Sequence, residues 1–412
     1  MNGDYQRHIP VIRVRALPCC GFPFARSPDF WIGCYTFTMV PGHVSHSGTA
    51  RFRDRFPVLA HAGHFRQPER VPHLSNTWIS SIGMGTYLGE PDGITDQRYT
   101  EAALAALANG VNLLDTAINY RFQRSERSIG AALKTAIDSG GVHRDQLLVC
   151  TKAGYLTYDS TIPADPRRYF LEEYVDSGVV PREELVGGMH CMAPSYLKNQ
   201  LERSRRNLGV QTIDVFYVHN PEQQLTEVSA DIFYDRVRRA FESLEEEVAS
   251  GKIRVYGTAT WNGYRKDPSE RDYLDLGKIA GIAREVGGEA HHFRVVQLPF
   301  NLGMPEAFAN MSQKIGSRQM SLLAAAQELG IAVIASATLL QGKLARQLPE
   351  FVRETLGCDS DAEAAIQFVR SAPGITSALI GMSHSEHVGT NLKVASRPAA
   401  KLTEWESLFQ PR

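Results

Sequence analysis

Four polar side chains stand at, or just beyond, the ends of short apolar segments of the chain: Asp115, Tyr120, Lys152 and His219. A tyrosine is a poor proton donor at neutral pH, because the pKa of its phenol is about 10. A nearby cation such as Lys152 stabilises the phenolate and lowers that pKa, but a shift of about 3 units needs roughly 4 kcal/mol, which one cation is not expected to supply alone. Asp115 can hold the ammonium group and His219 can hydrogen-bond a substrate oxygen. The set indicates general acid catalysis at a carbonyl that receives a hydride.

Each of these residues also has a structural explanation when it is taken alone. Asp115 could cap a helix, Tyr120 could be a partly buried aromatic residue, and Lys152 could extend along the surface. His219 could be an ordinary hydrogen-bonded polar residue. The catalytic interpretation therefore depends on a fold that brings all four together.

Short, nearly continuous apolar runs alternate with longer amphipathic segments from Trp78 onward, a pattern typical of βα units around a buried parallel sheet. The helical segments carry apolar stripes, such as Ile129, Leu133 and Ile137. Eight runs predict a closed (β/α)8 TIM barrel, in which the four polar residues meet at the carboxyl-terminal mouth. The runs begin at Ile82, Val111, Leu147, Ile213, Ile253, Val295, Ile331 and Ala378.

Two segments fall outside this pattern. Residues 1–76 show no sustained period and are expected to form a flexible or loosely packed N-terminal extension, with a short helix possible within 49–65. Residues 77–412 are expected to form the barrel. The connection after the third strand, from Tyr155 to His190, is too long for a simple turn, and long loops at this end of a barrel are usually functional.

Composition limits the partners. The chain has 412 residues, 43% of them hydrophobic and 22% charged, which excludes a disordered or fibrous protein. With 44 Lys and Arg against 45 Asp and Glu, no basic field favours nucleic acid. There is no apolar run of the ~18 to 20 residues that a membrane helix needs, and Arg and Pro interrupt every candidate signal segment. A cytoplasmic protein is expected; its oligomeric state is left open.

Several motifs together resemble the aldo-keto reductase superfamily. They are Gly110-Val-Asn-Leu-Leu-Asp115-Thr-Ala-Ile-Asn-Tyr120, Ser125-Glu126-Arg-Ser-Ile-Gly130, Thr151-Lys152-Ala-Gly, Phe216-Tyr-Val-His219-Asn-Pro, Val295-Val-Gln297-Leu-Pro-Phe-Asn-Leu, Gln341-Gly342 and Ile380-Gly381. The order and spacing match the Asp, Tyr, Lys and His tetrad of that family, and the resemblance covers about residues 78–396.

The resemblance implies an NADP(H)- or NAD(H)-dependent oxidoreductase that transfers a hydride between the nicotinamide and a small aldehyde or ketone, or the matching alcohol. Tyr120 would be the general acid or base, Lys152 would tune its pKa, Asp115 would orient Lys152, and His219 would position the substrate oxygen. Gln297 would bind the nicotinamide carboxamide. The segment from Gly381 to Asn391 would bind the adenosine end at a helix N-terminus, with contacts from Gly381, Ser383, His387 and Asn391.

The chain departs from the family pattern at three places. Ala259 and Thr260 stand where Ser and Asn commonly hold the carboxamide, so only Thr260 offers a polar contact. Ser336 occupies a position where an aromatic ring often stacks on the nicotinamide. The segment expected to meet a 2′-phosphate has histidines instead of Lys or Arg, which favours NAD or dual use slightly, although Arg318 or Lys343 could supply a charge.

Three other interpretations compete. The glycine-rich segment 83–89 imitates a Rossmann loop, but its spacing is one residue too long. A zinc hydrolase would need histidines at strand ends, where only His219 stands, so no metal site is predicted. A nicotinamide-binding barrel with a regulatory or redox-sensing role and little turnover is the principal alternative. His190, Cys191, Tyr155 and Tyr158 are expected to be structural or pocket-lining.

Overall fold

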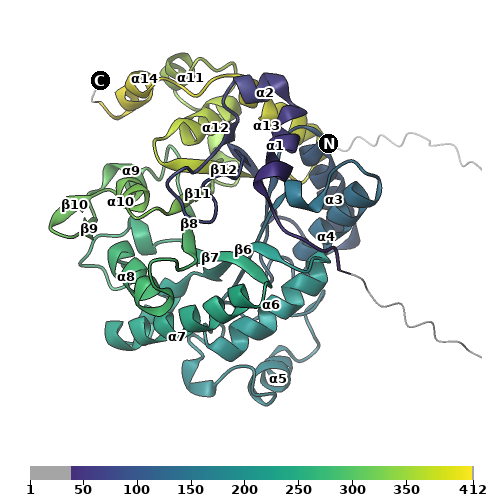
Figure 1. The fold of residues 1–412 in the computed structure, drawn as a ribbon, viewed down its shortest axis with the longest axis vertical. Coiled ribbons are helices and arrows are strands. Elements are labelled where there is room, and N and C mark those ends of the chain that lie inside the picture. The colour runs from purple at the N-terminus through teal and green to yellow at the C-terminus, as the bar shows by residue number, and fades with distance from the viewer. Residues whose placement is uncertain (1–38, 411–412) are drawn as a thin grey trace, which may run out of the picture. The chain divides into compact units, whose positions relative to one another are not determined.

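Eight parallel strands close into a barrel in the computed structural model, which describes residues 39–410 (Figure 1). Each strand pairs with the next along the chain, and the last pairs with the first. The (β/α)8 barrel expected from the sequence is confirmed, and every expected run contributes a strand. The barrel strands are β3 (Ile82–Gly85), β4 (Leu113–Asp115), β5 (Leu148–Ala153), β6 (Ile213–His219), β7 (Ile253–Ala259), β8 (Phe293–Pro299), β11 (Ala332–Ser336) and β12 (Ile375–Gly381).

Helices surround the strands in chain order (Figure 1). Their apolar stripes face inward, since Ile129 and Leu133 are fully buried. Local signals set their ends: the Asp92 carboxylate accepts from the Thr95 N–H, and Gly209 ends a helix at φ +68°. The helices of the barrel layer are α3 (Gly93–Ala108), α4 (Arg124–Asp138), α6 (Pro194–Leu208), α7 (Ala230–Ala249), α8 (Leu276–Gly287), α10 (Leu322–Glu328), α12 (Asp361–Ser371) and α13 (Ser385–Leu392).

A close approach between β7 and β8 requires glycine. The register of this strand pair shifts between Tyr256 and Gly257, and a Cβ on Gly257 would lie 1.8 Å from the carbonyl oxygen of Val295. No side chain fits in that space. The shift brings Ala259 opposite Gln297, so that both stand at the mouth of the barrel.

Residues 39–80 pack across the amino-terminal end of the barrel. Val44, Leu74 and Ile79 share a buried apolar cluster with side chains from seven barrel strands. The buried Asp214 carboxylate accepts from the Val44 N–H at 2.8 Å and from the Arg144 guanidinium at 2.7 Å. The carboxyl-terminal end is left for the cavity described below. This segment contains α1 (His46–Asp54), α2 (Pro57–His61), β1 (Phe65–Arg66) and β2 (Ile79–Ser80).

The expected N-terminal extension lies partly outside the described residues, because nothing before residue 39 is described. Within the described part, residues 39–76 are folded, and the helix expected within 49–65 corresponds to parts of α1 and α2. No helix between residues 39 and 410 has the length and apolarity needed to cross a membrane.

The remaining elements are short and lie in the loops. The long connection after β5 contains α5 (Pro166–Phe170), followed by a further helical turn over residues 171–175, and it projects beyond α6 and α7 (Figure 1). The others are α9 (Glu306–Ala309), β9 (Gln313–Ile315), β10 (Arg318–Met320), α11 (Glu350–Leu356) and α14 (Leu402–Glu406).

A buried histidine makes the stability of the barrel sensitive to acid. His64 is fully buried between Ser81 Oγ at 3.0 Å and the Gly110 carbonyl oxygen at 3.1 Å, and burial lowers its pKa to about 3. Because the unfolded chain takes up this proton below about pH 6.5, the contribution of His64 to the unfolding free energy falls as the pH drops from 6.5 towards 3. Between pH 7 and pH 5 the loss is about 2 kcal/mol.

Denaturant unfolding of the wild type and of His64→Gln at both pH values tests this expectation. The variant keeps polar atoms at the site but cannot take up the proton, so its unfolding free energy should depend on pH by about 2 kcal/mol less than that of the wild type. Parallel pH dependences would show that His64 is not responsible.

Candidate active site

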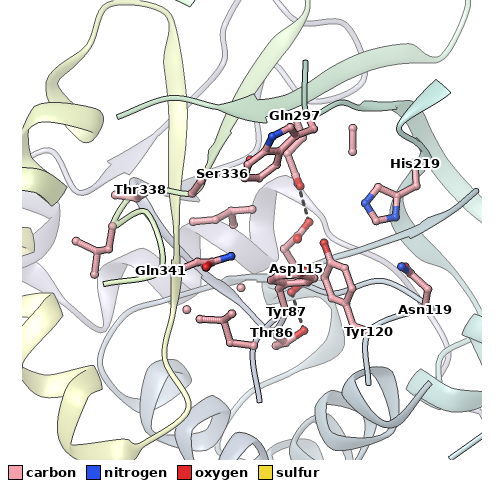
Figure 2. A pocket seen from close by; sticks show the side chains of 18 of the residues that line it. Thr86, Tyr87, Asp115, Asn119, Tyr120, His219, Gln297, Ser336, Thr338 and Gln341 are labelled. Atoms are coloured by element: carbon pink, nitrogen blue, oxygen red, sulfur yellow. Dashed lines mark hydrogen bonds between the residues drawn. The ribbon is translucent and has the colours of Figure 1, made fainter. Parts of the chain in front are cut away.

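A cavity of about 1030 Å³ opens at the carboxyl-terminal ends of the barrel strands. The side chains of Asp115, Tyr120 and His219 line it, as Figure 2 shows. Lys152 lies beside them, fully buried, at the end of β5. The structure therefore brings the four sequence-predicted catalytic candidates together from three neighbouring strands: Asp115 and Tyr120 from the end of β4 and its loop, Lys152 from β5 and His219 from β6.

Lys152 and Asp115 form a buried ion pair at the floor of the cavity. The Lys152 ammonium donates to Asp115 Oδ1 at 2.5 Å and to the Thr116 carbonyl oxygen at 2.8 Å. Burial opposes the charge on Lys152, but the Asp115 carboxylate and the smaller contribution of Tyr120 together outweigh it and raise the pKa of the lysine above its usual value. The ammonium is therefore charged throughout the physiological pH range.

The ring of Tyr120 lies over this pair, with its centroid 5.0 Å from the Lys152 Nζ. Burial raises the pKa of Tyr120 above its usual value, and the Lys152 charge only partly offsets this effect. Lys152 lowers the pKa of Tyr120 as the sequence suggested, but desolvation of the phenolate outweighs the cation, so the net shift is upward. At neutral pH the phenol is protonated and can donate its proton.

His219 stands across from Tyr120 as a neutral imidazole. The two ring centroids are 5.8 Å apart at an interplanar angle of 74°. Burial, and then the Lys152 charge, lower the pKa of His219 well below its usual value. Its buried Nδ1 has no hydrogen-bond partner among residues 39–410, so it is available to a ligand.

A buried chain of side chains fixes the backbone of His219. His190 Nε2 donates to the His219 carbonyl oxygen at 2.8 Å, and the Gln224 amide donates to His190 Nδ1 at 2.7 Å. Arg236 donates to the amide oxygen of Gln224. Burial lowers the pKa of His190 to about 4, which keeps the ring neutral. His190 is therefore structural, as expected from the sequence.

The backbone after Tyr120 is strained. Arg121, Phe122 and Gln123 follow one another at φ of 47°, 57° and 71°, in the left-handed region where side chains with a Cβ are disfavoured. The buried Arg121 guanidinium clamps this turn, donating to Asp96 Oδ1 at 2.6 Å and to Ser125 Oγ at 3.0 Å. This turn, which sets the position of Tyr120, has no periodic pattern in the sequence.

Arg121→Ala should therefore impair catalysis more than binding. Loss of the clamp lets the strained turn relax and moves the Tyr120 phenol, and a displacement of about 1 Å costs on the order of 100-fold in rate. We expect kcat to fall ~10- to 100-fold while the cofactor dissociation constant changes less than about twofold. Lys134→Ala, which removes an exposed pair with Asp138 on the same helix, is the matched control. Equal kcat values for the two variants would contradict the positioning role.

Most of the residues expected to contact a cofactor line the cavity at or after β7, β8, β11 and β12. The buried hydroxyl of Thr260 has no partner within residues 39–410, and the same is true of Thr338, a residue that sequence reasoning missed. Ser383 is the exception among the expected residues, because it does not line the cavity and its Oγ lies 3.1 Å from His384 Nδ1. The expected residues that line the cavity are Thr260, Gln297, Ser336, Gly381, His387 and Asn391.

Gln297 is hydrogen-bonded to Asp115. Its amide nitrogen donates to Asp115 Oδ2 at 2.8 Å, the carboxylate oxygen that does not bind Lys152. Both oxygens of Asp115 are thus occupied, and this arrangement fixes the carboxylate beneath Tyr120. The sequence suggested only a ligand contact for Gln297.

The cation that lines the cavity is neither Arg318 nor Lys343, the two that the sequence suggested. Arg318 lies on β10, is 66% exposed and pairs with Glu328, and neither it nor Lys343 lines the cavity. Instead Arg346 lines it, exposed and without an ion pair within residues 39–410. It follows a loop in which Leu340 and Gln341 adopt positive φ, a conformation that no sequence period indicates.

The long loop after β5 forms another part of the wall. Tyr155 and Tyr158 both line the cavity, so of the two expected roles, structural or pocket-lining, both residues have the second. Cys191 is buried and does not line it. No group of three or more His, Cys, Asp and Glu side chains that could hold a metal ion occurs between residues 39 and 410.

The fold and the residues at the carboxyl-terminal end of the barrel together define a class of protein: a (β/α)8 barrel with a tyrosine over a buried lysine–aspartate pair. Residues 81–266 match the model of the Aldo/keto reductase family. The NADH-specific methylglyoxal reductase of Escherichia coli is 26% identical over 206 residues, which cover 49% of this chain and 53% of that protein. The D-threo-aldose 1-dehydrogenase of a Pseudomonas species is 26% identical over 204 residues, which cover 46% and 52%. The chain spans about half the length of the curated relatives it matches.

Solved structures show the same fold. The glycerol dehydrogenase AKR11B4 from Gluconobacter oxydans superposes with a TM-score of 0.56 at 19% identity, covering 84% of this chain and 94% of that one. An aldo/keto reductase from Klebsiella pneumoniae, solved in complex with NADP and acetate, gives a TM-score of 0.54 at 18% identity, covering 82% and 94%. These solved structures show the fold, and the match of residues 81–266 to the family model bears out the resemblance to aldo-keto reductases over that part of the chain.

Proposed function

We propose that this protein is an oxidoreductase that transfers a hydride between a nicotinamide cofactor, NADP(H) or NAD(H), and the carbonyl group of an aldehyde or ketone, or the matching alcohol. The observation that carries the proposal is the Lys152 ammonium, held 2.5 Å from Asp115 beneath the ring of Tyr120, which lines a large cavity. Family membership of residues 81–266 and a relative described as an NADH-specific reductase support it.

Each catalytic candidate has a role that its environment explains. Tyr120 is protonated at neutral pH, since burial raises its pKa further above neutrality, and it donates its proton to the carbonyl oxygen during reduction. The Lys152 ammonium then stabilises the phenolate, and Asp115 holds that ammonium in place. His219 is neutral, so one ring N–H orients the carbonyl oxygen without competing as an acid. A reduced nicotinamide bound at this site would supply the hydride.

The residues present fit such a cofactor. Figure 2 shows Ser336, Thr338 and Gln341 on the side of Tyr120 away from His219. The buried hydroxyls of Thr260 and Thr338 have no hydrogen-bond partner among the described residues. A carboxamide or a ribose of a bound ligand can form hydrogen bonds with them. The cavity of about 1030 Å³ has room for both a cofactor and a substrate. We propose that Thr260, Gln297, Ser336, Gly381, His387 and Asn391 hold the cofactor.

Arg346 is the cation best placed for a cofactor phosphate. Its guanidinium has no ion pair within the described residues, and Arg346 follows β11, the neighbour of β12, after which His387 also lines the cavity. Arg346→Ala should raise the dissociation constant for NADPH about fivefold, equivalent to ~1 kcal/mol for an exposed charge pair. Lys343→Ala, one turn away and outside the cavity, should leave it unchanged. Fluorescence titration with NADPH and NADH measures both variants, and equal effects would remove Arg346 from the site.

The test of the proposal is the change in nicotinamide absorbance when the purified protein meets NADPH or NADH together with an aldehyde such as propanal. Turnover with either cofactor supports the oxidoreductase. Tight cofactor binding without turnover would favour the alternative, a regulatory or redox-sensing barrel. Failure to bind either cofactor would overturn the proposal.

A further inference from the structure

The half of the cavity on the His219 side has aromatic and neutral walls. Side chains from the loops after three strands, β4, β5 and β7, contribute to it, and none of them carries a formal charge. They are Phe122, Tyr155, Tyr158, Phe170, Met189 and Trp261.

This half lies opposite the charged wall. The long loop that contains Tyr158 and Phe170 follows β5, whereas Arg346 follows β11. In the closed barrel three strands separate β5 from β11 in either direction, so the two loops stand on opposite sides of the mouth. A substrate against the β5 loop is therefore remote from the guanidinium of Arg346.

The aromatic side chains pack against one another and form a preassembled wall. The rings of Tyr158 and Phe170 are stacked, with centroids 4.7 Å apart and an interplanar angle of 5°. Phe122 meets Tyr158 edge to face at 5.4 Å. The buried Tyr174 anchors the loop, since its hydroxyl donates to the Thr157 carbonyl oxygen at 2.7 Å. Flat aromatic surfaces of this kind favour a flat aromatic ligand.

The same half is unfavourable for an anion. The Asp115 carboxylate is already neutralised by Lys152, and no lysine or arginine lines this part of the cavity. Behind Trp261 lies the buried Glu222, whose Oε1 accepts from the Trp261 N–H at 2.7 Å and whose Oε2 has no partner among the described residues. A carboxylate on the substrate would lose its water without gaining a cation.

We propose that the substrate is an uncharged carbonyl compound with a flat aromatic body, and that the β5 loop selects it through Tyr158 and Phe170. This inference rests on the proposed function, because it names the substrate class of the same site. The carbonyl group lies at Tyr120 and His219, and the ring lies against the aromatic wall.

Two pairs of aldehydes test the charge and the ring separately. para-Formylbenzamide and para-formylbenzoate have nearly the same shape and differ in charge, and we expect kcat/KM to favour the amide by at least ~100-fold. Benzaldehyde and cyclohexanecarbaldehyde differ in the aromatic ring, and we expect benzaldehyde to be favoured about 5- to 10-fold. A ratio near one in the first pair overturns the charge selection, and a ratio near one in the second overturns the aromatic selection.

Two neighbouring residues on α5 supply matched variants. Phe170→Leu removes a ring from the wall and should reduce the preference for benzaldehyde over cyclohexanecarbaldehyde to less than about twofold. Tyr169→Leu changes a ring on the same helix that does not line the cavity, and it should keep the wild-type preference. If Phe170→Leu also keeps that preference, the β5 loop does not select the substrate.

A binding measurement separates failure of this inference from failure of the proposed function. Calorimetry with para-(hydroxymethyl)benzamide and para-(hydroxymethyl)benzoate needs no turnover, and each probe places its hydroxymethyl group at Tyr120. Tighter binding of the amide, by at least about tenfold, supports the inference even if no aldehyde is reduced. Equal binding overturns it even if turnover with propanal has supported the proposed function.

Discussion

Tyr120→Phe should lower kcat for aldehyde reduction by about three orders of magnitude, within the range of ~10²- to 10⁴-fold for loss of a general acid. The substitution removes one oxygen and leaves the ring that packs 5.1 Å from Tyr87 and 5.8 Å from His219. Without the phenol, the carbonyl oxygen receives no proton as it gains charge. The measurement is nicotinamide oxidation under saturating cofactor and aldehyde.

The fold and the cofactor site should be unaffected by this substitution. Circular dichroism and the cofactor dissociation constant are expected to match those of the wild type, and Tyr87→Phe, at the rim of the cavity, serves as the control. Retention of more than about a tenth of the wild-type kcat by Tyr120→Phe would show that another group supplies the proton.

Lys152→Met should impair both activity and stability. It leaves the Asp115 carboxylate, which is 3% exposed, as a buried charge without its partner. Breaking a buried pair in this way costs about 3 to 5 kcal/mol of unfolding free energy. Activity should fall by ~10²-fold or more, because the phenolate that forms on Tyr120 loses its nearest cation. Denaturant unfolding and turnover are measured on the same preparation.

The double variant Asp115→Asn with Lys152→Met distinguishes the two effects. It removes both charges, so most of the lost stability should return while activity stays low. Recovery of activity together with stability would show that the pair is structural only. A single variant as stable as the wild type would contradict the buried ion pair itself.

The barrel could be predicted from the sequence because its strands are buried on both faces and so read as continuous apolar runs. The candidate catalytic residues could be predicted once the fold was predicted, since the carboxyl-terminal ends of neighbouring strands meet at one end of the barrel. Residues 39–76 escaped prediction because their packing depends on single anchors, Val44 and Leu74, and on strands of two residues, β1 and β2. Such contacts leave no period in the sequence.

The other shortfalls arise in loops and in burial. Arg346 and Thr338 reach the cavity through a loop with positive φ at Leu340 and Gln341, which are not glycines and gave no turn signal. The direction of the Tyr120 pKa shift depends on how deeply the phenol is buried relative to Lys152. That depth is a property of the packed structure and could not be estimated from spacing along the chain.

The proposed hydride transfer can be followed with a deuterium label. The protein is mixed with an aldehyde and with reduced nicotinamide cofactor that carries deuterium in place of both hydrogens on the ring carbon that gives up the hydride. The alcohol product is then analysed by mass spectrometry. We expect one deuterium on the former carbonyl carbon of each product molecule, and a loss of this product in Tyr120→Phe. An alcohol without deuterium, or cofactor that binds while no labelled alcohol forms, would contradict it.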